Sequence, residues 1–113
     1  MSDDVRVVMR LRAKAETVEQ LKQVLFDLSS ASSKEDGCHS YKVFLNQSDP
    51  LDLVLYETWR DQASVDAHLT TAHVQQAFAK GLLLLDGTPD RQVYTAIDRH
   101  INRPGEIKIS STP

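Results

Sequence analysis

The sequence of 113 residues contains a single cysteine, Cys38, and only four glycines and four prolines. One cysteine excludes an internal disulfide and any zinc or iron–sulfur site built from several cysteines, and it fits a reducing compartment. The 41% of hydrophobic and 26% of charged residues are typical of a globular domain and not of a disordered chain. We therefore expect most of the chain to fold around one hydrophobic core.

The sequence also lacks clusters of Lys and Arg and long apolar runs. The formal net charge is −3, so we expect no binding to nucleic acid or to an anionic membrane surface. The longest apolar run near the C-terminus, Leu82 to Leu85, is far shorter than the about 20 residues that span a bilayer. The acidic N-terminus does not resemble a signal peptide. These features predict a soluble, cytoplasmic protein.

Hydrophobic periodicity predicts four strands and an element order β-α-β-β-α-β. Alternation of apolar and other residues predicts strands over residues 5–13, 39–47, 51–59 and 91–98. A turn at residues 48–50 joins the two middle strands into a hairpin. Between the first two strands, helical spacing predicts a helix that opens with a capping box at residues 17–20 and runs to about Ser32. Gly37 then allows the chain to reverse with a positive φ.

The second helical region is predicted in two pieces. Asp61 is the predicted N-cap of a helix through about Leu69, and Thr71 is that of a helix through about Leu85. The resulting fold class is α+β, ferredoxin-like, with every helix on one face of a four-stranded antiparallel sheet. The other face is left open, so we expect two copies to pair through it as a barrel-like homodimer.

Residues 1–98 are assigned to this domain and residues 99–113 to a C-terminal tail. In the tail, Pro104 and Gly105 precede an alternating segment with Ile107 and Ile109. This pattern fits a fifth short strand that contacts the partner subunit, and it also fits an unstructured tail. Both interpretations stay open.

Glu57 is predicted to lie on an apolar strand face. Period 2 places Glu57 and Trp59 on the same face as Leu53 and Leu55. The adjacent strand carries Tyr41. A carboxylate on such a face either pairs with an arginine of the first strand or has a raised pKa, and a raised pKa prepares a general base. The ion pair is the more common arrangement.

His68 and His73 are the remaining candidates for acid–base chemistry near neutral pH. Thr70 and Thr71 lie between them and interrupt the helix, so the two rings are predicted on different elements and do not form a HExxH zinc site. Either histidine can instead cap a helix end or stabilise an interface. Because no phosphate loop, flavin or nicotinamide fingerprint or Ser-His-Asp order is present, we predict no cofactor and no metal.

Three segments together resemble the antibiotic biosynthesis monooxygenase family: Glu35-Asp36-Gly37-Cys38-His39-Ser40-Tyr41, Leu55-Tyr56-Glu57-Thr58-Trp59-Arg60-Asp61 and Ala67-His68-Leu69-Thr70-Thr71-Ala72-His73-Val74. The resemblance covers about residues 5–98 and implies a dimeric α/β barrel. Members of this family include cofactor-free oxygenases of quinols or polyketide phenols, an isomerase of a phosphorylated signalling sugar, and haem-degrading proteins. The fold alone does not choose among these activities.

The resemblance and the missing cofactor fingerprints imply a cofactor-independent monooxygenase that oxidises a small quinol or phenol with dioxygen. His68, His73 or Glu57 would take the phenolic proton, and Tyr41 and Trp59 would orient the ring and exclude water. We expect the pocket between the sheet and the helices.

Three other activities compete with this one. An isomerase of a small phosphorylated or keto substrate would need a basic anchor such as Arg10, Arg12 or Arg60. In a non-catalytic dimer that binds a small ligand, the same side chains would only pack. Haem degradation is not expected, because the first strand, residues 5–13, has no counterpart of the Asn that haem-processing members use.

Overall fold

The computed structural model describes residues 4–98 of the chain. Its elements are β1 (Val5–Arg12), α1 (Val18–Ser32), β2 (Cys38–Asn46), β3 (Asp49–Trp59), α2 (Gln62–Leu69), α3 (Ala72–Gly81), a 3₁₀ turn η1 (Leu82–Leu84) and β4 (Asp90–Thr95). The predicted α+β, ferredoxin-like fold is confirmed. The predicted tail and its candidate fifth strand lie outside the described residues.

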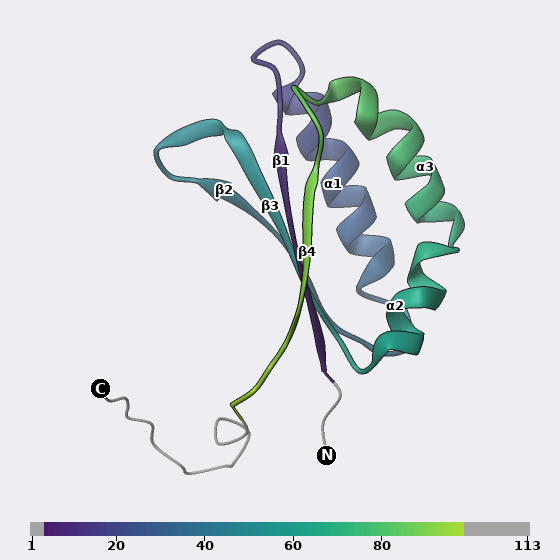
Figure 1. The fold of residues 1–113 in the computed structure, drawn as a ribbon. Coiled ribbons are helices and arrows are strands. Elements are labelled where there is room, and N and C mark those ends of the chain that lie inside the picture. The colour runs from purple at the N-terminus through teal and green to yellow at the C-terminus, as the bar shows by residue number, and fades with distance from the viewer. Residues whose placement is uncertain (1–3, 99–113) are drawn as a thin grey trace.

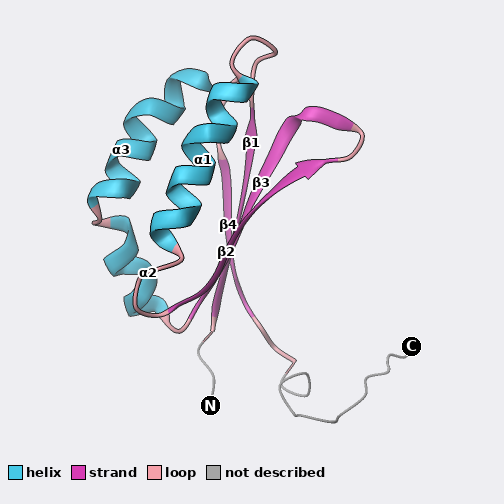
Figure 2. Ribbon diagram, turned by 180° about the vertical axis from the view of Figure 1, so that it is seen from behind, coloured by secondary structure: helices cyan, strands magenta, loops and turns pink. Residues whose placement is uncertain are grey.

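The four strands form one antiparallel sheet in the order β2-β3-β1-β4. The first strand of the chain therefore lies in the interior of the sheet, paired with β3 on one side and β4 on the other. α1, α2 and α3 all cover one face of this sheet (Figure 1), and the view from behind shows them on that same face (Figure 2). No helix within residues 4–98 combines the length and the apolar character needed to span a membrane.

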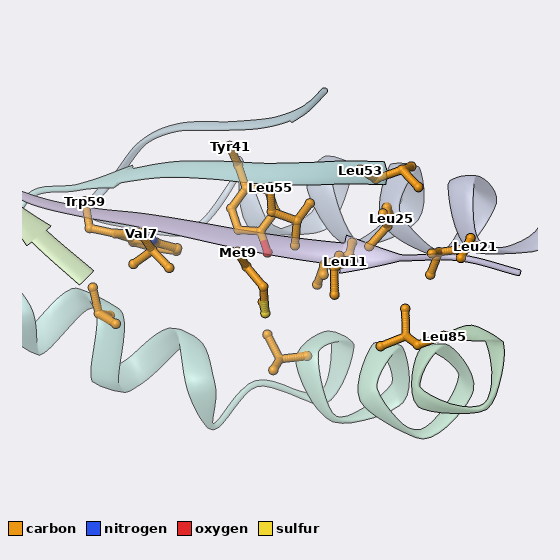
Figure 3. Close-up of a cluster of buried hydrophobic side chains, with 14 of the residues drawn as sticks. Val7, Met9, Leu11, Leu21, Leu25, Tyr41, Leu53, Leu55, Trp59 and Leu85 are labelled. Carbon is orange, nitrogen blue, oxygen red and sulfur yellow. The ribbon is translucent and has the colours of Figure 1, made fainter. Parts of the chain in front are cut away.

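The hydrophobic core lies between the sheet and the helices. β1 forms because its apolar residues alternate with arginines and Val8, which turns Val7, Met9 and Leu11 toward the helices (Figure 3). Buried residues of α1 recur every three or four positions on the facing side of the helix. Burying each such leucine stabilises the fold by about 1.5–3 kcal/mol. This packing holds α1 against the sheet and leaves its C-terminal end beside β2.

The predicted capping box at the start of α1 is wrong. Thr17 is the N-cap of α1, but its φ and ψ lie near the helical region and its side chain makes no capping bond. Its hydroxyl instead donates to the carbonyl oxygen of Leu84 at 2.7 Å and accepts from the backbone N–H of Lys14 at 3.2 Å. Thr17 therefore ties the start of α1 to the end of η1. The helix ends at Ser32, as predicted.

β1 and β2 match their predicted bounds to within one residue, and larger differences occur at three other places. The hairpin turn is shorter than predicted, because β3 already begins at Asp49. The β2–β3 register shifts between Leu45 and Asn46. This shift accommodates Pro50, which cannot donate a backbone hydrogen bond. α3 ends at Gly81 and continues only as the tighter η1, after which Leu85 bridges to the strand-like residue Ala13. β4 spans residues 90–95, so it ends before the predicted limit.

Candidate active site

A cavity of about 250 Å³ lies between the sheet and the helices, where the pocket was expected. Most of its wall is apolar, and its polar groups come from four residues: Tyr41, Glu57, His68 and Arg91. Its volume is close to the lower end of the range of ligand pockets in proteins, about 300–1,000 Å³. The cavity therefore suits a small molecule with an apolar body and few polar groups.

Glu57 lines this cavity and is 3% exposed. Its Oε1 accepts a hydrogen bond from Nε1–H of Trp59 at 2.8 Å, and Tyr41 is its direct partner across the β2–β3 ladder. Burial raises the pKa of the Glu57 carboxyl, while the hydrogen bond from Trp59 opposes this shift. Burial and the nearby Glu57 charge also raise the pKa of the Tyr41 hydroxyl.

The predicted ion pair between Glu57 and an arginine of the first strand is wrong. Among the described residues, the arginines of β1 bond to other partners: Arg6 donates to Tyr56, Arg10 to Asp52 and Arg12 to Asp49. These arginines alternate with the buried residues of β1, so they lie on the sheet face away from the cavity. The other interpretation, a buried carboxyl with a raised pKa, describes Glu57.

His68 is packed against the two predicted aromatic residues of the site. The ring centroid of His68 lies 4.6 Å from that of Trp59 and 5.6 Å from that of Tyr41. His68 is in the last turn of α2, which Asp61 caps by accepting from the backbone N–H of Ser64 at 2.9 Å. Tyr41 and His68 line the cavity, but Trp59 is not among the described residues that do. The indole of Trp59 is fully buried and contacts Glu57 and His68 instead.

Glu35, which the sequence did not identify as a site residue, joins the two histidines. Its Oε2 lies 2.6 Å from Nδ1 of His68 and 2.6 Å from Nε2 of His73. His68 belongs to α2 and His73 to α3, as their separation by two threonines predicted. Thr71 caps α3 and also donates its hydroxyl to the carbonyl of His68 at 2.8 Å, which brings both rings to Glu35.

The contact with Glu35 defines which nitrogen of His68 can react. A carboxylate only accepts hydrogen bonds, so the neutral imidazole of His68 donates Nδ1–H to Glu35 and keeps an unprotonated Nε2. His68 also lines the cavity, and Nε2 is the ring nitrogen that its contact with Glu35 leaves free to accept a proton. A carboxylate that orients an imidazole in this way is a common arrangement for general-base chemistry.

Arg91 of β4 supplies the positive charge at the cavity. It pairs with Met9 across the β1–β4 ladder and so shares the helix-facing side of the sheet. The arginines proposed from the sequence as anchors do not line the cavity: Arg10 and Arg12 pair with aspartates of β3, and Arg60 pairs with Asp36 and Asp61. Alternation within β4 puts Arg91 on one face with Val93, but the position of that face at the cavity depends on the pairing of β4 with β1.

The similarity of this chain to known proteins covers Glu35 and both histidines. The family model described as antibiotic biosynthesis monooxygenase matches residues 4–80. The Bacillus subtilis (strain 168) protein named putative monooxygenase YcnE is 31% identical over 80 residues, which cover 71% of this chain and 84% of that protein. The structure of Rv0793 from Mycobacterium tuberculosis matches with a TM-score of 0.81 at 25% identity, covering 85% of this chain and 97% of that one. A structure titled putative antibiotic biosynthesis monooxygenase from Deinococcus radiodurans matches with a TM-score of 0.80 at 27% identity, covering 95% of this chain and 99% of that one.

Proposed function

Because the chain belongs to the antibiotic biosynthesis monooxygenase family, we propose that it oxidises a small quinol or phenol with dioxygen and without a bound cofactor. The observation that carries this proposal is the imidazole of His68, held by Glu35 through Nδ1 at the edge of a largely apolar cavity. Such a cavity accepts an aromatic ring and limits the access of water. A base at its wall can remove the proton that makes the ring electron-rich.

In the proposed reaction, Nε2 of His68 takes the hydroxyl proton of the bound quinol. The resulting phenolate passes one electron to dioxygen, and the substrate radical and superoxide combine to form a carbon–oxygen bond. His68 returns its proton to the resulting peroxide, which becomes a hydroperoxide. Loss of water from this hydroperoxide leaves one oxygen atom on the ring. The sum is one quinol and one dioxygen converted to one hydroxyquinone and one water, so the substrate supplies both electron pairs and no external reductant is needed.

Glu57 and Arg91 have complementary roles in this proposal. Since its pKa is raised, Glu57 can hold a proton closer to neutral pH than an ordinary carboxyl, and it can deliver that proton to the departing water. Arg91 stabilises the negative charge of the phenolate. Tyr41 orients the ring from the cavity wall, and Trp59 holds Glu57 in place.

Oxygen uptake by the purified protein with a panel of quinols and phenols tests the proposal. We expect His68→Ala to lower kcat by about 10²-fold or more, the contribution typical of a general base. The matched control is His39→Ala, which removes an exposed histidine and should leave kcat unchanged. His73→Ala should cost less than His68→Ala, because Glu35 still holds His68. No uptake above buffer with any substrate, from a folded protein, would contradict the proposal.

One observation favours a second candidate activity. Arg91 places a cation at the cavity beside Glu57, and this pair suits an isomerase that binds an anionic keto or phosphorylated substrate and moves a proton. This reaction would proceed without oxygen, whereas quinol oxidation requires it. Turnover of such a substrate in an anaerobic assay, abolished in Arg91→Gln, would favour the isomerase.

We also propose that two copies pair through the open sheet face. The side chains opposite the helices include those of Val8, Phe44, Val54, Tyr56 and Tyr94. In the ladders Val8 lies across from Tyr56, Val54 from Phe44, and Tyr94 from Arg6. Phe44 is 48% exposed and Tyr94 is 54% exposed in the single chain. We expect sedimentation analysis to find a dimer that Phe44→Asp dissociates. The control, Leu83→Asp, alters an exposed leucine on the helical side, and equal dimerisation of both variants would contradict this interface.

A further inference from the structure

Glu35, His68 and His73 form a cluster whose donor atoms suit a metal ion. The two imidazole nitrogens and a carboxylate oxygen all lie within 4.8 Å of one another. They come from three separate segments: the connection after α1, the end of α2 and the start of α3. Two imidazoles and one carboxylate are ligands that zinc and other divalent transition ions bind. We propose that this cluster binds one such ion, of the Zn²⁺ or Co²⁺ class.

The geometry requires only small movements to accept the ion. At metal–ligand bonds of about 2.1 Å, neighbouring ligand atoms of a tetrahedral site lie about 3.4 Å apart. The two contacts of Glu35 Oε2, each 2.6 Å, must therefore open by less than about 1 Å, and the two histidine nitrogens, which lie within 4.8 Å of each other, need to approach by no more than about 1.4 Å. The Glu35 and His73 side chains are 15% and 28% exposed, so both have room to turn. His68 is the buried ligand and fixes the position of the site.

The surrounding residues hold the ligands in place before any ion arrives. Thr71 joins the two histidine-bearing helices through its bonds to the carbonyl of His68 and the backbone N–H of Val74. Glu35 is held in the turn that its carbonyl closes with the backbone N–H of Cys38 at 3.1 Å. With three protein ligands and a partly exposed edge, a water molecule can complete the coordination. Mg²⁺ is not expected to bind, because it prefers oxygen ligands.

Metal binding at this cluster would change the chemistry of the cavity. A neutral imidazole that binds a metal through Nδ1 carries its proton on Nε2. His68 would then present an N–H donor to the cavity instead of the unprotonated nitrogen that the proposed oxygenase uses as its base. The ion would therefore inhibit the reaction. This second step rests on the proposed function, whereas metal binding itself does not.

Equilibrium dialysis of the metal-free full chain against Zn²⁺, and titration with Co²⁺ followed by visible absorption, test the binding. We expect one ion per chain and a Co²⁺ spectrum typical of four ligands. His73→Ala should weaken binding by at least about 10-fold, as should Glu35→Gln, and the exposed-histidine control His39→Ala should bind like the unmodified protein. No binding at one equivalent, or unchanged binding by a folded His73→Ala, would overturn the proposal.

The inhibition is measured separately, as oxygen uptake with and without one equivalent of Zn²⁺. Inhibition that His73→Ala reduces at least about 10-fold supports the switch of His68 from base to donor. Full activity with the ion bound would overturn that switch. A protein that binds Zn²⁺ but oxidises no substrate would retain the metal site and refute the oxygenase, so the two failures are distinguishable.

Discussion

Gly37 connects the end of α1 to β2 and has a φ of +88°. An added Cβ would lie 2.2 Å from Oγ of Ser64 and 2.7 Å from its Cβ, well inside van der Waals contact. Gly87 has a similar φ of +93°, but within residues 4–98 no heavy atom outside Gly87 and its two chain neighbours lies within 4 Å of the position that an added Cβ would take there. The two glycines therefore separate the cost of the backbone conformation from the cost of a steric clash.

The expected magnitudes follow from these two geometries. A non-glycine residue in the left-handed region costs about 1–2 kcal/mol, and we expect Gly87→Ala to lower the free energy of unfolding by that amount. Gly37→Ala adds the overpacking of Ser64, about 1–3 kcal/mol more. Its total destabilisation is then about 2–5 kcal/mol. Since Ser64 belongs to the helix that carries His68, the same substitution should also displace the imidazole from Glu35 and lower oxygen uptake.

Urea unfolding at one pH, with each variant fitted for its midpoint and slope, measures both changes. Equal destabilisation by Gly37→Ala and Gly87→Ala, at unchanged slopes, would refute the clash with Ser64. In a thermal scan the clash should appear as an additional decrease in Tm of about 4–8 °C for each kcal/mol.

Two further predictions concern groups whose pKa the fold raises. The pKa of Glu57 in the folded chain lies above its ordinary value of 4.5, so the folded chain binds this proton more tightly and loses stability as pH rises through the folded pKa. Glu57→Gln removes that loss. In urea unfolding, the stability of this variant relative to the unmodified protein should therefore rise as the pH increases from about 4 toward neutral. A stability difference that does not change with pH would contradict the raised pKa. Burial, with the charges of Glu35 and Glu57, raises the pKa of Cys38 to about 11. The rate of iodoacetamide labelling should rise with pH until about that value, and a plateau near the ordinary cysteine pKa of about 8.5 would contradict it.

Much of the fold could be predicted because its signals are local. Alternation in β1, helical spacing in α1 and the caps at Asp61 and Thr71 depend on residues a few positions apart. The element order and the ferredoxin-like fold could therefore be read from the sequence alone. The same pattern placed Glu57 on the buried face of β3 and separated the two histidines onto different helices. The failed capping box shows the limit of local signals, because Thr17 bonds to Leu84, which is distant in sequence.

Which of these groups meet depends on how the elements pack together. Glu35 lies 33 positions from His68 and 38 from His73, and no periodicity relates a loop carboxylate to the ends of two later helices. The choice of Arg91 as the cation of the cavity likewise depends on the pairing of β4 with β1, which the alternation in each strand does not specify. The sequence determined which face each side chain occupies, whereas the packing of α2 and α3 against the end of α1 assembled the site, because contacts between distant segments form only when the elements pack together.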